Sequence, residues 1–398
     1  MSKILVINAG SSSIKISLFL KENYKLIANG IAERITLDLG KISIKYNGKK
    51  YEKEIKLPDY ETAINELYKL MHKIELVKSK KEIQNIGFRV VQGGNYINNT
   101  VIIDQNIIDI IDKCSIYAPL HNPGALQSIL GFRKVFPEAI LTADFDTSFH
   151  STIEKVNYVY PINKEITEKY NVRKYGAHGI SHQFITEKLS QILDKDRVTF
   201  INLHLGNGAS ICAVKDSKSI DTSMGLTPLA GIMMGTRSGD IDPSIHQFVM
   251  KSMNINIDQF TNILNKESGL MGVSGISSDM RDLRKAIAEN NKDALFALEL
   301  FTQKIADYTS IYFNKLGGKI DAIVFTAGIG ENNAYVRTEI INKLYFRKIK
   351  LNQKLNNGKI GEFQLISTFD SEIPVYVIRT NEELVIARNS VNITDQNE

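Results

Sequence analysis

Apolar and polar residues alternate through much of the first sixty positions, and this period of two predicts β-strands. Strands are expected over residues 4–7, 14–20, 24–35 and 41–57. The last stretch contains Asn47-Gly48, which favours a two-residue hairpin turn, so it should form two paired strands. The chain is therefore expected to begin as an antiparallel meander.

A helical period takes over after Pro58, where four apolar residues recur at three- and four-residue spacing and so share one face. These residues are Ile64, Leu67, Met71 and Ile74. A strand is expected next, over residues 82–91, and it runs into the turn residues Gln92-Gly93-Gly94.

One unit recurs along the chain, a short apolar strand that runs into a glycine-rich polar turn. The turns are "NAGSSS", "HLGNGAS" and "TAGIGEN", and predicted helices over 182–196 and 293–318 precede the second and third. The first two turns lie about 196 residues apart, which indicates two related βα halves. A boundary is expected near residues 147–150, with a cleft lined from both sides.

Phosphate binding is the function that these turns favour together. Glycine at a strand end lets the backbone approach an anion, and small hydroxyl residues add hydrogen-bond donors. The chain contains no GxxxxGK[ST], which excludes a P-loop, and neither "GNGASI" nor "GIGENN" completes a dinucleotide fingerprint. Each turn taken singly also fits a plain loop.

The first turn also matches S-x-x-K, from Ser12 to Lys15, the nucleophile motif of serine acyl-enzymes. The partner motifs S-D-N and K-T-G are missing, as is G-x-S-x-G, so covalent serine catalysis is disfavoured. Lys15 could instead direct its ammonium toward a bound anion. A solvated surface lysine is the equally weighted alternative.

Composition narrows the setting. At 398 residues, two domains are the default, and 43% apolar with 23% charged residues is typical of a soluble globular protein without a membrane span. The start of the chain lacks a signal-peptide pattern, and Cys114 and Cys212 have no metal-site spacing, so a cytoplasmic location is expected. The net charge of +5 is dispersed, which disfavours nucleic acid as a partner.

Arginine, histidine and aspartate cluster in glycine- and proline-rich loops between residues 86 and 284. Two arginines that converge on one small anion are typical of phosphoryl transfer, because the guanidinium grips phosphate and carboxylate through two hydrogen bonds. Aspartate could accept a proton or orient a nucleophile, and histidine could stabilise the transferring group. A structural role is the alternative for each histidine. A metal cluster is disfavoured, since no HExxH pair occurs.

Nine motifs, in order from residue 6 to residue 388, resemble the acetokinase family of short-chain acyl kinases. They are "VINAGSSSIK", "APLHNP", "FDTSFH", "YGAHGISH", "HLGNGAS", "DTSMGLTPLAGIMMGTRSGDIDP", "SSDMRDL", "FTAGIGEN" and "TNEELVIAR". The resemblance implies an α/β protein with two actin/Hsp70/sugar-kinase-like, ribonuclease H-like domains around a nucleotide cleft. The domains would be residues 1–148 with 383–398, and residues 149–382, in a homodimer.

The same resemblance implies reversible, direct in-line phosphorylation of acetate by ATP, with Mg²⁺ or Mn²⁺. Asp146, His178 and Arg237 would be catalytic; Arg89 would bind the substrate carboxylate, and Val91, Leu120 and Pro228 would line its apolar pocket. Asn8 and Glu382 would hold the metal ion. ATP would be bound by Lys15, by His204, Leu205, Gly206, Asn207 and Gly208, by Asp279, Met280 and Arg281, and by Gly328, Ile329, Gly330, Glu331 and Asn332.

Four residues depart from the pattern of this family. Phe88 and Gln92 replace histidines, Ala230 replaces a glutamate, and Ala177 replaces a phenylalanine beside His178. A lost ring would enlarge the acyl pocket or leave His178 less supported. Propionate or butyrate kinase activity is therefore an alternative. A non-catalytic nucleotide sensor and a filament protein are further alternatives, both disfavoured by the acyl-side arginine and aspartate.

Overall fold

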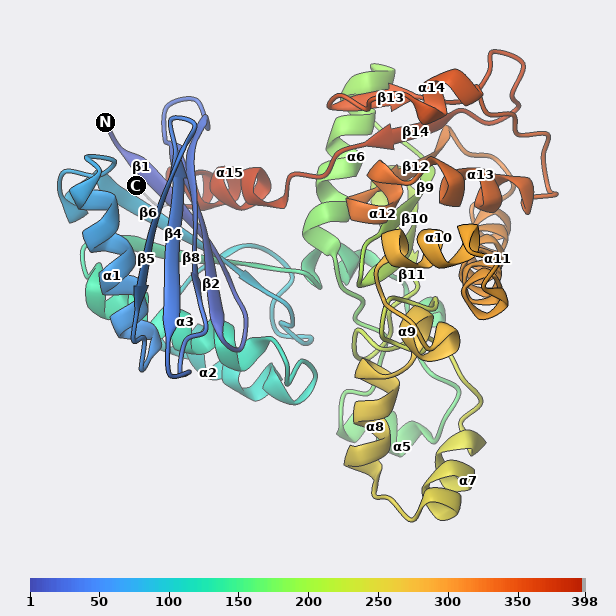
Figure 1. Ribbon diagram of the computed structural model, residues 1–398, viewed down its shortest axis with the longest axis horizontal. Helices are drawn as coiled ribbons and strands as arrows, with labels where there is room; N and C mark the ends of the chain where they lie inside the picture. The colour runs from blue at the N-terminus through green and yellow to red at the C-terminus, as the bar shows by residue number, and fades with distance from the viewer. Residues whose placement is uncertain (396–398) are drawn as a thin grey trace. The chain divides into compact units, whose positions relative to one another are not determined.

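The structure is a computed structural model that describes residues 1–395 (Figure 1). Two mixed sheets with helices confirm the predicted α/β class. The chain forms two compact units: unit 1 contains Met1–Phe149 and the segment from Asn381, and unit 2 contains His150–Thr380. None of the helices formed by residues 1–395 combines the length and the apolar character needed to span a membrane.

Unit 1 is built on a sheet of eight strands, counted within residues 1–395, in the order β5-β4-β3-β2-β1-β6-β8-β7. The strands are β1 (Lys3–Ala9), β2 (Ser13–Leu20), β3 (Leu26–Glu33), β4 (Gly40–Tyr46), β5 (Lys49–Ile55), β6 (Ile83–Val90), β7 (Val101–Ile102) and β8 (Ile140–Phe145). The predicted meander is confirmed. Asn47 and Gly48 both have positive φ, as a type I′ hairpin turn requires.

Unit 2 is built on six strands of the described chain, in the order β11-β10-β9-β12-β14-β13. They are β9 (Phe200–Leu205), β10 (Ala209–Lys215), β11 (Lys218–Thr222), β12 (Ala322–Thr326), β13 (Phe363–Leu365) and β14 (Val375–Ile378). The five strands β11-β10-β9-β12-β14 repeat the directions of β3-β2-β1-β6-β8, two antiparallel pairings followed by two parallel ones. Two related halves were expected from the recurring strand and turn.

The helices of unit 1 are α1 (Tyr60–Lys73), α2 (Gln105–Lys113), α3 (Asn122–Val135) and α15 (Glu382–Asp395). Those of unit 2 are α4 (Lys155–Tyr158), α5 (Lys164–Lys169), α6 (Gly179–Leu193), α7 (Ser244–Met253), α8 (Ile257–Lys266), α9 (Gly269–Ser274), α10 (Met280–Ala288), α11 (Lys292–Lys315), α12 (Ala327–Asn332), α13 (Ala334–Asn342) and α14 (Gln353–Asn357). Short 3₁₀ turns span η1 (Lys80–Glu82), η2 (Cys114–Ile116) and η3 (Ser148–Thr152).

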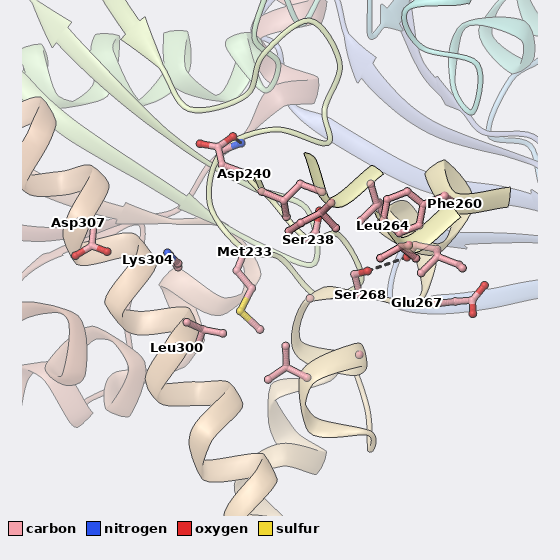
Figure 2. A pocket seen from close by; sticks show the side chains of 18 of the residues that line it. Met233, Ser238, Asp240, Phe260, Leu264, Glu267, Ser268, Leu300, Lys304 and Asp307 are labelled. Atoms are coloured by element: carbon pink, nitrogen blue, oxygen red, sulfur yellow. Dashed lines mark hydrogen bonds between the residues drawn. The ribbon is translucent and has the colours of Figure 1, made fainter. Parts of the chain in front are cut away.

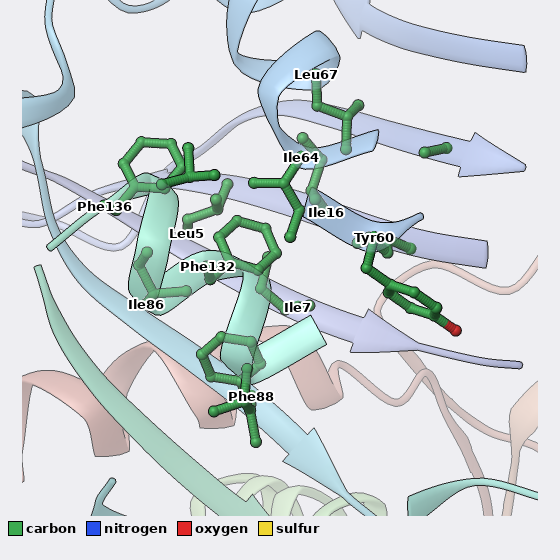
Figure 3. Close-up of a cluster of buried hydrophobic side chains, with 14 of the residues drawn as sticks. Leu5, Ile7, Ile16, Tyr60, Ile64, Leu67, Ile86, Phe88, Phe132 and Phe136 are labelled. Carbon is green, nitrogen blue, oxygen red and sulfur yellow. The ribbon is translucent and has the colours of Figure 1, made fainter. Parts of the chain in front are cut away.

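The core of unit 1 lies between its sheet and helices α1 and α3 (Figure 3). Helix α1 begins after Asp59, whose carboxylate accepts a hydrogen bond from the Thr62 amide, and it buries Ile64 and Leu67 as predicted. Phe88 of β6 packs edge-on against Phe132 of α3, with ring centroids 5.6 Å apart. The departure at Phe88 is therefore a core residue, and its ring contributes buried apolar area.

The third glycine-rich segment differs from the expected open turn. After β12, residues Ala327–Asn332 form helix α12, although two of the six are glycines. Ala327 enters it with φ of 64°, a backbone conformation that non-glycine residues seldom adopt. A tertiary contact helps to hold this helix, because the amide of Thr380 donates to the Glu331 carboxylate at 3.1 Å.

Candidate functional site

Three of the predicted residues lie at the carboxyl ends of neighbouring parallel strands in unit 1. Asn8 is near the end of β1, Arg89 near the end of β6, and Asp146 directly follows β8. The strands pair in parallel, with Ile7 beside Phe88 and Arg89 beside Asp144. Carboxyl ends of adjacent parallel strands meet at one edge of a sheet, where ligands bind in open α/β sheets. The register thus gathers the three residues at one edge.

Arg89 and Asp146 form a two-bond ion pair in unit 1. The guanidinium Nε donates to Oδ1 at 3.0 Å and Nη2 donates to Oδ2 at 2.7 Å. Glu382, the first residue of α15, places Oε2 3.6 Å from the same Nε. Burial opposes the charge of Arg89, yet Asp146 and Glu382 raise its pKa above the ordinary value. Within residues 1–395, Nη1 of Arg89 makes no hydrogen bond, so donors remain for a ligand.

Glu382 lies mostly buried at the start of its helix, with its side chain 17% exposed. Burial raises the pKa of this carboxyl to about 7; Arg89 opposes the shift, and Asp146 and Glu383 add to it. A nearby positive charge stabilises a buried carboxylate. The ion pair between Glu382 and Arg89 is long, at 3.6 Å, so it provides this stabilisation only weakly.

Lys15 lies on β2 directly opposite Asn8 of β1. Directly opposed residues in an antiparallel pair project to the same face, so both side chains share one side of the sheet. Lys15 is exposed, and its ammonium makes no ion pair with any described residue. Its assignment to phosphate stays a prediction, as does that of Asn8 to a metal ion.

Helix α3 packs closely against the first turn. A Cβ atom on Gly124 would lie 2.5 Å from the carbonyl oxygen of Gly10, so only glycine allows the helix to approach this closely. The Tyr60 hydroxyl donates to the same carbonyl. Ser11 and Ser12 stay exposed on the turn.

In unit 2, the turn between β9 and β10 divides the predicted phosphate-binding segment into two parts. His204 and Leu205 are buried within β9, while Gly206, Asn207 and Gly208 form the tip. The Gly206 amide donates to the Gly208 carbonyl at 3.1 Å, and the Gly235 amide donates to the Asn207 carbonyl at 2.9 Å. The tip is therefore the part of this segment that can contact a phosphate through its backbone.

Gly208, His178 and Arg237 are brought together in unit 2. A Cβ atom on Gly208 would lie 3.4 Å from Nη1 of Arg237 and 3.6 Å from Nε2 of His178. Arg237 donates to the Pro228 carbonyl at 3.1 Å but has no carboxylate partner among residues 1–395. Burial lowers its pKa, and no acidic group offsets that. A mostly buried cation of this kind is suited to an anionic ligand.

His178 adopts the left-handed conformation, with φ of 58°, at the start of α6. Its ring stacks on that of His204, with centroids 4.2 Å apart, and its Nδ1 lies 2.9 Å from the Ser210 hydroxyl. Backbone strain at a non-glycine residue persists where the surroundings fix it, as at many active sites. Support for His178 therefore comes from Ser210 and His204, although Ala177 supplies no ring.

Asp279 and Arg281 open helix α10 as a mutually paired set. The Asp279 carboxylate caps the helix by accepting from the Arg281 amide at 2.8 Å, and the Arg281 guanidinium binds the same carboxylate. This hydrogen bonding lowers the pKa of Asp279 to about 2. Met280 is buried between them, so its side chain serves the core.

Helix α12 contains the other predicted nucleotide residues, Gly328 to Asn332. The Glu331 carboxylate is turned inward, since it accepts from the amides of Ala327 at 2.9 Å and Thr380 at 3.1 Å. Sequence reasoning missed Arg337, which is buried and donates to the carbonyls of Gly330 and Glu331 at 2.8 and 3.1 Å. Burial lowers its pKa to about 10. A lone arginine in a helical pattern gives no signal that it is buried.

The three predicted pocket residues lie in different settings. Val91 directly follows β6 and is half-buried, while Leu120 precedes α3 and is 48% exposed. Pro228 of unit 2 is half-buried, and its carbonyl accepts from Arg237. The acyl pocket that they would line stays a prediction.

Two of the departures, Gln92 and Ala177, are buried residues. Gln92 is buried, and its side-chain oxygen accepts from the Gly94 amide at 2.9 Å. Ala177 is buried too, and its carbonyl lies 3.0 Å from Nε2 of His150. Ala230 lies near Gly225, where an added Cβ would be 3.0 Å from the alanine methyl group.

Comparison with known proteins places these residues in a family. A model of the Acetokinase family matches residues 3–388. A protein named acetate kinase from Mycoplasmopsis pulmonis (strain UAB CTIP) is 60% identical over 388 residues, with 98% of each chain covered. The family resemblance drawn from the motifs is thereby confirmed.

Solved structures are similar over nearly the whole chain. The acetate kinase of Porphyromonas gingivalis has a TM-score of 0.93 at 35% identity, covering 99% of this chain and 100% of that one. A propionate kinase from Francisella tularensis subsp. tularensis SCHU S4 has a TM-score of 0.93 at 40% identity, covering 98% and 100%.

Proposed function

Because the chain belongs to the acetokinase family, we propose that it transfers the γ-phosphoryl group of ATP to acetate and also catalyses the reverse reaction. An acetate oxygen forms a bond to the γ-phosphorus while the bond from that phosphorus to the ADP oxygen breaks. The products are acetyl phosphate and ADP. The observation that carries the proposal is the meeting of His178 Nε2 and Arg237 Nη1 at Gly208.

On the phosphate side, these two groups meet the chemical need of the reaction. The transferring group spreads negative charge over its equatorial oxygens, and donors already in place stabilise it at no reorganisation cost. Arg237 supplies a cation without a carboxylate partner among the described residues, and His178 supplies a neighbouring ring nitrogen. The tip Gly206–Gly208, with Lys15, Asp279–Arg281 and Gly328–Asn332, is assigned to ATP.

On the carboxylate side, Arg89 is assigned to acetate. Its Nε and Nη2 bind Asp146, which leaves Nη1 to donate to the substrate carboxylate. Asp146 holds the guanidinium in one orientation, so the attacking oxygen would be presented in a fixed direction. Val91, Leu120 and Pro228 are assigned to the methyl group.

We assign a divalent cation, Mg²⁺ with Mn²⁺ as the alternative, to Asn8 and Glu382. Both offer oxygen donors, which Mg²⁺ prefers, and the Glu382 carboxylate has only a weak ion pair. Groups of three or more acidic, histidine or cysteine ligands are absent from residues 1–395. That fits an ion that takes most ligands from water and substrate phosphates. When bound, it would neutralise phosphate charge.

The acyl preference is tested by turnover across a series of acids. The kcat/KM values for acetate, propionate and butyrate would be compared at saturating ATP. Acetate should give the highest value, with each added methylene lowering it by about 10-fold or more if the pocket discriminates. Ala177 favours the propionate alternative, and a higher value for propionate would establish it. ATP binding without any acyl phosphate would favour a sensor instead.

A homodimer is proposed from the apolar surface of unit 2. Phe248 of α7 is 72% exposed, and Phe296 and Ile311 of α11 are 57% and 50% exposed. A cavity of about 570 Å³ lies among these helices (Figure 2), with Phe260 and Leu300 in its lining. Ile311 also lines this cavity, and exposed apolar side chains beside an apolar hollow favour an interaction site. The cytoplasmic location stays a prediction.

Light scattering of the protein as it elutes from a size-exclusion column measures its mass and so tests the proposed dimer. The unaltered chain should have the mass of two copies, and Phe248→Asp should shift it toward one. Phe369→Asp is the matched control, because Phe369 is fully exposed elsewhere in unit 2. A monomeric unaltered chain would refute the assignment.

A further inference from the structure

A chain of buried hydrogen bonds leads to the back of His178 within unit 2. The Asn202 amide nitrogen on β9 lies 2.8 Å from Nδ1 of His182 on α6. Nε2 of His182 lies 2.9 Å from the hydroxyl of Ser210 on β10, and that hydroxyl lies 2.9 Å from Nδ1 of His178. Asn202, His182 and Ser210 are fully buried. These three side chains are therefore shielded from bulk solvent.

We call this series of hydrogen bonds the relay; it runs through Asn202, His182, Ser210 and His178. Along the relay, each group donates to the next in the same direction. An amide nitrogen only donates, so Nδ1 of His182 accepts from Asn202. Burial lowers the pKa of His182, with nearby His150 and His204 adding to the shift, so its ring is neutral and carries its one hydrogen on Nε2. That nitrogen donates to Ser210, whose own hydroxyl hydrogen is then directed to His178.

The direction of the relay determines which ring nitrogen of His178 carries the hydrogen. If Nδ1 of His178 accepts a hydrogen bond, the neutral ring must carry its hydrogen on Nε2, the atom that faces Gly208. The other tautomer would direct a lone pair at the phosphoryl oxygens and repel them. Stacking on His204 holds the ring plane but does not choose between the tautomers.

We propose that His182 and Ser210 are positioning residues, which fix His178 in the tautomer that donates from Nε2 to the transferring phosphoryl group. This role rests on the proposed function in one respect only, namely that the group contacted by Nε2 of His178 is the transferring phosphoryl group. Asn202 sets its direction, because a reversed amide would present an acceptor and send every hydrogen the other way. The buried Oδ1 of Asn202 has no partner among residues 1–395, so the relay is the only hydrogen bonding its side chain makes there.

The test follows the ring nitrogens directly. The full chain, labelled with ¹⁵N-histidine, would be studied by long-range ¹H–¹⁵N correlation, and His178 among the seven histidines would be assigned through His178→Gln. We expect the unaltered protein to show an unprotonated Nδ1 and a protonated Nε2 at His178. Ser210→Ala should give mixed tautomers and lower kcat by roughly 10-fold or more, with both KM values within about twofold.

Ser219→Ala is the matched control. Ser219 is also a fully buried serine, and it hydrogen-bonds a different histidine, His150, at 2.8 Å. The Ser219→Ala protein should lose as much stability as the Ser210→Ala protein, while its kcat and the nitrogen signals of His178 should stay unchanged. A proton on Nδ1 of His178 in the unaltered chain would overturn the proposal, as would an unchanged kcat with unchanged signals in Ser210→Ala. Full activity in His178→Gln would overturn the catalytic assignment instead, and the nitrogen signals would still decide the relay.

Discussion

Arg89 holds Asp146 through two parallel hydrogen bonds, Nε to Oδ1 at 3.0 Å and Nη2 to Oδ2 at 2.7 Å. The carboxylate is 1% exposed, so this pair is largely removed from water. Breaking a buried pair by removing one partner typically costs about 3–5 kcal/mol, because the other charge is left uncompensated. The pair therefore links the stability of unit 1 to the orientation of the guanidinium that we propose binds acetate.

Asp146→Asn should leave a folded protein that has lost most turnover, by about 10²- to 10⁴-fold in kcat. The amide keeps the shape of the carboxylate but removes its charge, and its nitrogen would face the Arg89 donors. Coupled detection of ADP measures the rate, and thermal unfolding confirms the fold. Turnover within threefold of the unaltered enzyme would remove Asp146 from the mechanism.

Arg237→Ala should lower kcat by about 10²- to 10³-fold, the usual loss when one donor to a developing anion is removed. Stability should change little, since no carboxylate of the described chain pairs with this guanidinium and burial disfavours its charge. Arg237→Lys is the matched control, and it should restore only part of the rate because an ammonium lacks the planar fork. Equal rates in all three proteins would contradict the assignment.

Arg337→Met should raise the KM for ATP more than that for acetate. The buried guanidinium holds the carbonyls of Gly330 and Glu331 in α12, a helix that its two glycines disfavour. Methionine retains apolar volume without the donors, so those carbonyls lose their partner. Initial rates at varied ATP and varied acetate separate the two effects; equal rises in both KM values would show a general loss of structure.

Asp144 should make unit 1 less stable as the pH rises from about 4 to 7. Burial raises the pKa of this carboxyl to about 7, although hydrogen bonds from Asn389 and Thr100 oppose the shift. The folded chain thus keeps a proton that the unfolded chain has lost, so its stabilising effect is complete below pH 4 and gone above pH 7. The difference is on the order of 4 kcal/mol.

The control for this pH effect is Asp144→Asn, which resembles the protonated acid at every pH. Denaturant unfolding of both proteins would be measured at intervals between pH 4.5 and pH 8, in steps chosen to bracket neutrality. The stability of the variant relative to the unaltered chain should rise across this range. A constant difference would mean that the carboxyl is ionised throughout.

Local patterns determined much of what was predictable. The meander and α1 follow from periods of two and 3.6, which depend on near neighbours in sequence, and the Asn47-Gly48 turn follows from its backbone preference. The roles of Asn8, Arg89 and Asp146 were predicted from the family resemblance, and the parallel register gathers these residues at one edge of the sheet. The meander, α1 and the turn were therefore predictable, because their causes lie in residues that are close together in the sequence.

Long-range contacts account for what the sequence did not reveal. The relay joins His182, Ser210 and Asn202 from one helix and two strands, and no local spacing connects them. Helix α12 forms despite its glycines because Arg337 and the amide of Thr380 supply hydrogen bonds from outside the helix. Such features arise only once the chain is folded.

The proposed phosphoryl transfer to acetate can be followed by ³¹P NMR of the protein mixed with ATP, Mg²⁺ and acetate. Acetyl phosphate and ADP should appear together in equal amounts, and neither should form when acetate is omitted. ADP released with inorganic phosphate alone, or ATP that stays intact in the presence of acetate, would show that the protein does not phosphorylate acetate.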